Sequence, residues 1–175
     1  TIGMSAAQIY AEGRAFLELW KNDLNSVLRL FETAQSQEIR NYAIRLLKID
    51  FSDKLSSLPM GFISRVISCK TFEGTELAYL WLSSQCGFGT EEFVAKGAHI
   101  PTLALLRVAD ELNHDKALTF SKNYIANHAK ELVDNIPISD LHWMINHNKE
   151  QILSLGVHLF GIDQYQTQMS LEDWT

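Results

Sequence analysis

Apolar residues recur along most of the chain at the three- and four-residue spacing of an amphipathic helix. The two clearest stripes are Leu24, Val27, Leu28 and Phe31, then Ile39, Tyr42, Ala43 and Leu46. Gln35 and Ser36 make a short connection between the two helices, and Ser36 is a suitable N-cap for the second helix. This pair of stripes predicts an antiparallel helical hairpin.

The same spacing continues through the rest of the chain, and residues typical of helix ends punctuate it. Before the first hairpin, Ser5 and Gln8 fit a capping box for an N-terminal helix. Later helices are expected to start near Pro59, Gly74–Thr75, Pro101 and Pro137, with a turn at 113–115. Alternation typical of a strand is absent over even five residues. The pattern therefore predicts an all-α fold of stacked helical hairpins, similar to an α-solenoid.

Sliding the chain over itself by 78 residues aligns two stretches of about 60 residues. Pro59 then falls on Pro137, and apolar positions match more often than identities do. A duplication explains this register, and chance matching of two helical patterns is the rival explanation. The predicted organisation is an N-terminal helix (1–26), a first helical unit (27–86), a connecting segment (87–104), a second helical unit (105–164) and a tail (165–175).

Composition and charge narrow the class of protein. The 175 residues are 46% hydrophobic with a formal net charge of −6, as expected of a globular domain with little affinity for a phosphate backbone. No apolar run approaches the roughly 20 residues of a membrane span, and residues 1–21 do not resemble a signal peptide. Cys69 and Cys86 form no CxxC pattern, so we expect reduced thiols and a cytoplasmic protein.

The second unit resembles a known helical domain. The stretch LLRVADELNHDKALTFSKNYIANHAKELVDNIPISDLHWMI is similar to the BACK domain of BTB-Kelch proteins, in the helices expected at 105–112, 117–132 and 138–145. The first unit fits the latter part of the same pattern more loosely. What the resemblance implies is a non-enzymatic helical scaffold, found in that family beside a dimerising domain and a substrate-binding propeller. No functional residue of the family transfers to a position of this chain.

Candidate catalytic and metal-binding residues do not form a recognisable motif. His142 and His147 are five positions apart, which on a helix separates their directions by about 140 degrees, unlike the i, i+4 pair of a zinc protease. The loop Gly87, Phe88, Gly89 lacks the lysine of a phosphate-binding loop and is followed by two glutamates. We therefore assign no catalytic residue, no cofactor and no metal, and expect a protein that is not an enzyme.

Charge and exposed aromatic residues suggest where a partner binds. Residues 27–86 carry a net charge of +1, whereas residues 105–164 carry −3. Candidate partner-binding residues are the basic strip and three aromatics outside the stripes: Arg29, Arg40, Arg45, Lys48, Phe88, Tyr165 and Trp174. The sequence favours a protein-interaction or adaptor module with a protein partner. An enzyme or ligand-binding protein with a pocket between helices is the alternative, and a nucleic-acid-binding solenoid is third.

Overall fold

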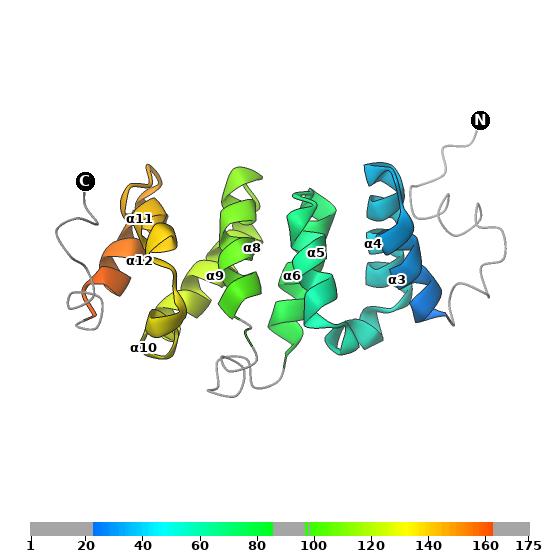
Figure 1. Cartoon of the computed structure of the whole chain (residues 1–175), viewed down its shortest axis with the longest axis horizontal. Helices are drawn as coiled ribbons and strands as arrows, with labels where there is room; N and C mark the ends of the chain where they lie inside the picture. Colours follow the sequence, from blue (N-terminus) through cyan, green and yellow to red (C-terminus); the bar gives the residue numbers. More distant parts are fainter. Residues whose placement is uncertain (1–22, 86–96, 98, 163–175) are drawn as a thin grey trace. The chain divides into compact units, whose positions relative to one another are not determined.

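The computed structural model describes residues 23–85, 97 and 99–162, and every regular element in these ranges is helical (Figure 1). No strand occurs among them, which confirms the predicted all-α fold. Within the same ranges, no helix combines the length and apolarity required to cross a membrane. Cys86, the expected tail and the expected N-terminal helix up to residue 22 lie outside the described residues.

The chain divides into two compact units, and from here on the first unit means residues 1–55 and the second unit means residues 56–175. The first unit holds a hairpin of two helices, α3 (Leu24–Thr33) and α4 (Gln37–Asp50). The Asp23 carboxylate caps α3: it accepts hydrogen bonds from the hydroxyl and the N–H of Ser26, and these bonds lower the pKa of Asp23. The Ser36 hydroxyl caps α4 by accepting the N–H of Ile39 at 3.3 Å. The predicted hairpin and its cap are confirmed.

The second unit contains three successive hairpins (Figure 1). They are α5 (Met60–Ser68) with α6 (Phe72–Ser84), α8 (His99–Glu111) with α9 (Asp115–Asn127), and α11 (Ile138–Ile145) with α12 (Glu150–Phe160). A short helix, α10 (Ala129–Leu132), and a 3₁₀ turn, η2 (Val133–Asn135), connect the second and third hairpins. A 3₁₀ turn, η1 (Ser52–Ser57), precedes α5.

The second helices of these hairpins lie side by side. Helix α6 packs against α9, and α9 packs against α12, while α5 packs against α8. We call α6, α9 and α12 the second-helix row. Each helix of the row has one buried side, because its apolar residues recur every three or four positions, as Ile152, Leu155 and Leu159 do in α12.

Two expected helix boundaries are wrong, and the reasons are local. Helix α6 begins at Phe72 rather than at Gly74–Thr75, because the Thr71 hydroxyl caps it by accepting the N–H of Gly74 at 3.1 Å. Gly74 instead allows α5 and α6 to approach closely, since a Cβ there would lie 3.0 Å from the Val66 carbonyl oxygen. Helix α8 begins at His99, so Pro101 lies inside its first turn, where the missing N–H has no intrahelical acceptor.

The long helix expected at 117–132 is also wrong, because α9 ends at Asn127 and the short α10 follows. The break is at His128, whose N–H still bonds to the Tyr124 carbonyl while its backbone leaves the helical region. Pro59 and Pro137 stand immediately before α5 and α11, as predicted. Cys69 ends α5 as a half-buried free thiol.

Helix starts repeat at the spacing of 78 residues that the sequence suggested. Gln37 and Asp115 begin α4 and α9, Met60 and Ile138 begin α5 and α11, and Phe72 and Glu150 begin α6 and α12. Each of these three pairs differs by 78 positions, and 3₁₀ turns precede both α5 and α11. The order of elements therefore recurs in register. Common origin by duplication, and the units 27–86 and 105–164, stay predictions.

Candidate functional site

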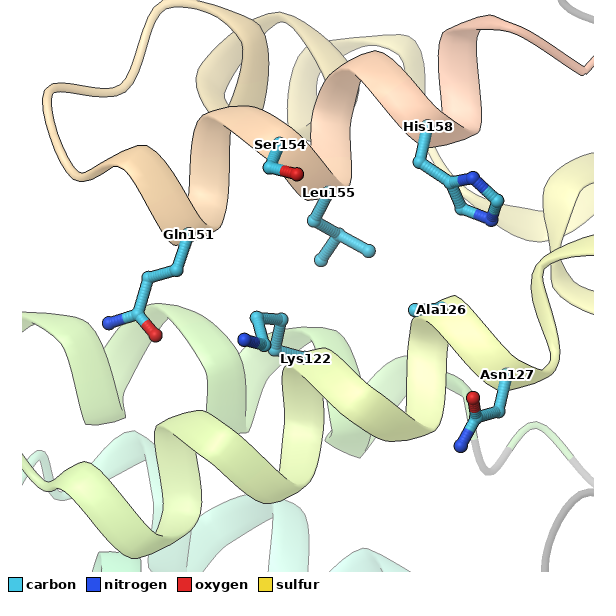
Figure 2. Close-up of a pocket in the computed structure, with 7 residues that line it drawn as sticks. All are labelled: Lys122, Ala126, Asn127, Gln151, Ser154, Leu155 and His158. Atoms are coloured by element: carbon cyan, nitrogen blue, oxygen red, sulfur yellow. The ribbon is translucent and has the colours of Figure 1, made fainter.

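A hollow of about 420 Å³ lies between α9 and α12, the last two helices of the second-helix row (Figure 2). Helix α9 contributes Lys122, Ala126 and Asn127. Helix α12 contributes Gln151, Ser154, Leu155 and His158. We call this hollow the α9–α12 groove. In Figure 2 the Leu155 side chain points from α12 toward α9, and Ala126 lies across from it, so the two form an apolar floor between polar residues.

The periodicity of both helices places these residues at the groove. On α12, Gln151, Ser154, Leu155 and His158 stand at i, i+3, i+4 and i+7, which is one side of a helix. Leu155 is at the edge of the buried stripe and is 3% exposed, whereas the other three are exposed. On α9, Lys122 and Ala126 are four positions apart and follow the buried Ser121 and Ile125. The groove is therefore the polar border where two amphipathic helices meet.

The α9–α12 groove is polar, with one lysine and two amides among its lining residues. Lys122 and His158 are its titratable residues, and no carboxylate lines it. Asn127 and Gln151 add amides, each with a donor and an acceptor, and Ser154 adds a hydroxyl. Within the described ranges, none of these five side chains makes a hydrogen bond or ion pair with the protein. They are available to a bound molecule.

A second hollow, of about 400 Å³, lies one step along the row between α6 and α9. Tyr79 of α6 lines it together with four residues of α9, namely Asp115, Lys116, Thr119 and Phe120. The Tyr79 and Phe120 rings meet edge to face with centroids 5.4 Å apart, which gives this hollow an aromatic wall. We call it the α6–α9 hollow. Both hollows share α9, so a ligand that runs across α9 can contact each of them.

A cluster of charged side chains lies elsewhere among the described residues, where α8 meets the loop between α11 and α12. The Asp110 carboxylate binds His147 Nε2 at 2.9 Å and Lys149 Nζ at 2.5 Å. Lys149 Nζ also donates to Asn113 Oδ1 at 3.0 Å. The side chains of Asp110 and His147 are only 12% and 11% exposed. We call these four residues the Asp110 cluster.

An aspartate beside a histidine invites comparison with a catalytic dyad, but the hydrogen bonds argue against it. His147 Nδ1 accepts the N–H of Lys149 at 3.1 Å, so this nitrogen carries no proton. Nε2 is then the protonated nitrogen, and it donates to Asp110. Both ring nitrogens are occupied, which leaves none to take a proton from a substrate. The cluster joins two hairpins through the ion pairs of Asp110 with His147 and Lys149.

A smaller hollow of about 260 Å³ lies between α8 and the start of α11, and its charged residues are also already paired. Arg107 Nε donates to Asp140 Oδ1 at 2.7 Å, and the guanidinium lies 4.6 Å from the centroid of the Trp143 ring. Among the described residues, no group of three His, Cys, Asp or Glu is placed to hold a metal ion. These polar residues therefore stabilise the stack of hairpins.

Tyr124 of α9 is a buried tyrosine with two ring neighbours. Its ring stacks on Phe120 with centroids 6.3 Å apart and lies 4.7 Å from the His128 ring. Burial, and to a smaller extent the Glu131 carboxylate, raises the pKa of Tyr124 to about 12. This phenol supports the row from within and remains protonated at neutral pH.

The basic residues singled out in the sequence all lie in the first unit, away from these hollows along the chain. Arg29 is exposed on α3, and Arg45 and Lys48 stand one turn apart on α4. Arg40 donates to the Ala34 carbonyl at 3.0 Å, so it closes the hairpin turn. The three aromatic candidates, Phe88, Tyr165 and Trp174, lie outside the described residues.

Sequence reasoning missed the groove residues because each is an ordinary polar residue on a helix surface. The available signal was the stripe of Gln151, Ser154 and His158 on one side of an apolar-backed helix. It did not reveal that α9 lies beside that stripe. A scan of the chain against protein-family models found no match, and searches of curated proteins and of solved structures found none either.

Proposed function

We propose that the chain is a non-enzymatic interaction module that binds a segment of another protein across the second-helix row. The observation that carries this proposal is the pair of adjacent hollows on α9, each about 400 Å³ and lined by unlike side chains. One offers amides and positive charge, the other aromatic rings, so a linear chain of amino acids can use both. A non-enzymatic scaffold is also the role that the resemblance to a BACK domain implies.

The alternative of an enzyme with a pocket between helices has less support. A catalytic pocket needs a base or nucleophile with a free atom directed at the substrate. His147 has its carboxylate partner but no free nitrogen, and His158 lines the α9–α12 groove without a carboxylate beside it among the lining residues. Polar groups that are satisfied within the fold stabilise it, whereas unsatisfied ones in a groove serve binding.

Site-specific crosslinking tests the proposal. A photoreactive phenylalanine analogue is placed in the full chain at Ser154 in the α9–α12 groove, at Thr119 in the α6–α9 hollow, or at the exposed Ser139 of α11 as a control. After irradiation in a native lysate, adducts are identified by mass spectrometry. We expect Ser154 and Thr119 to label neighbouring stretches of one partner sequence, and Ser139 not to label it. Unrelated adducts at all three positions, or none in the hollows with thermal stabilisation by a metabolite, would refute the proposal.

A further inference from the structure

We infer that the occupant of the α9–α12 groove is an extended peptide segment bearing acidic side chains. The inference rests on the proposed function and adds the chemistry and conformation of the partner. Its first support is charge. The chain carries 21 acidic against 15 basic residues, yet the seven residues that line this groove include a lysine and a histidine and no acid. A groove with one lysine and no acid on an acidic protein favours an acidic partner and disfavours cations.

The second support is the pair of amides. An extended peptide leaves its backbone N–H and C=O groups unpaired, and each needs a partner when the peptide is bound. Asn127 and Gln151 stand on opposite helices of the groove, and each offers both a donor and an acceptor without a partner in the described chain. A helical partner would satisfy its own backbone and would require a broad apolar surface. Only Ala126 and Leu155 of the seven lining residues are apolar, so the groove lacks the row of large apolar side chains that a bound helix would cover, and this favours the extended form.

Helix geometry sets the length of the segment. Gln151 and His158 are seven positions apart on α12, so they are separated by about 10 Å along the axis at roughly 1.5 Å per residue. An extended chain covers that distance with about three residues. Lys122 is near the Gln151 end and His158 is at the other end (Figure 2). The matching segment therefore places an acidic side chain at Lys122 and a hydrogen-bonding side chain about three positions away at His158.

Fluorescence anisotropy with defined probes tests the inference on the full purified chain. The probes are a fluorescein-labelled decapeptide of serine and glycine with glutamate at every third position, and its counterpart with lysine in place of glutamate. We expect the glutamate peptide to bind and the lysine peptide to bind at least about tenfold more weakly, since the positive charges of the lysine peptide meet the positive charge of Lys122. Raising the salt concentration should weaken the glutamate complex.

Two charge reversals make a matched pair of variants. Lys122→Glu reverses a charge inside the groove, and Lys130→Glu makes the same change on the exposed surface of α10. We expect the first to weaken the glutamate peptide at least about tenfold and the second to leave its affinity within about twofold. Lys122→Arg keeps the charge and should retain most of the affinity, and far-UV circular dichroism confirms that each variant is folded.

Several results would overturn the inference. These are equal affinity for the two peptides, no binding of either, equal losses in Lys122→Glu and Lys130→Glu, or displacement of the glutamate peptide by inorganic phosphate or RNA at lower concentration. Crosslinks from Ser154 and Thr119 to one partner, combined with any of these results, would leave the interaction module standing and remove only the acidic extended segment as its occupant.

Discussion

Among the described glycines, Gly156 is the one where an added methyl group would meet the closest neighbouring atoms. It lies on the side of α12 that faces α11, and a Cβ there would lie 2.8 Å from the Ile145 nitrogen and 2.8 Å from the Met144 Cβ. Ordinary contact begins at 3.4 Å, so the two helices would have to separate by about 0.6 Å. Because the opposing atoms are backbone and Cβ, no change of side-chain rotamer relieves the clash.

The expected magnitude follows from two opposed effects. Overpacking a core by a methyl group typically costs about 1–3 kcal/mol, and a clash with backbone belongs in the upper part of that range. Replacing glycine by alanine within a helix stabilises the helix by up to about 1 kcal/mol. We therefore expect Gly156→Ala to lower the free energy of unfolding by about 1–2 kcal/mol.

Gly61 provides the matched control, because it is also in a helix but has open space around it. A Cβ at Gly61 meets only the end of the Arg65 side chain, at 3.7 Å. Gly61→Ala should therefore raise the free energy of unfolding by roughly 0.4–1 kcal/mol. Both variants are measured by urea unfolding with far-UV circular dichroism. A Gly156→Ala protein as stable as the wild type would show that α11 and α12 do not approach each other this closely at Gly156.

Two further predictions concern buried polar groups. Asp110→Asn should lower the free energy of unfolding by about 2–3 kcal/mol, because it leaves Lys149 and His147 without their carboxylate. As a control, Glu111→Gln at the next position removes only an exposed ion pair and should lower the free energy of unfolding by under about 1 kcal/mol. Equal midpoints of the two variants in urea unfolding would contradict this prediction. The raised pKa of Tyr124 means that its phenol ionises in the unfolded chain from about pH 10 but in the folded protein only near 12, so stability is lost as the pH rises through this interval. Tyr124→Phe should lose less stability between pH 9 and 12, and parallel curves for the two proteins would exclude the effect.

The contrast between the Asp110 cluster and the α9–α12 groove illustrates how polar residues divide their roles in this protein. Asp110 and His147 are almost fully buried and use their hydrogen-bonding groups on each other and on Lys149. Lys122 and His158 lie in a groove without internal partners. Polar groups paired within the fold stabilise the packing of one hairpin on the next, whereas exposed polar groups without an internal partner can bind another molecule.

Local signals in the sequence were sufficient to predict the helices and several of their ends. Ser36 caps α4, and Pro59 and Pro137 stand just before α5 and α11, because capping and proline effects act within one turn of the chain. Gly74 shows the limit of such signals. From the sequence it is expected at the start of a helix, but it lies inside α6, where it allows close contact with Val66 of α5.

The amphipathic period determined that this chain folds into helices, and its short connections determined that they pair as hairpins. Tertiary structure alone decided which helices lie next to one another, because a polar stripe shows which side of a helix faces away from the core but does not show which helix lies beside it. The groove depends on that choice: Lys122 and His158 are 36 positions apart, and only the packing of α12 on α9 makes them two walls of one site.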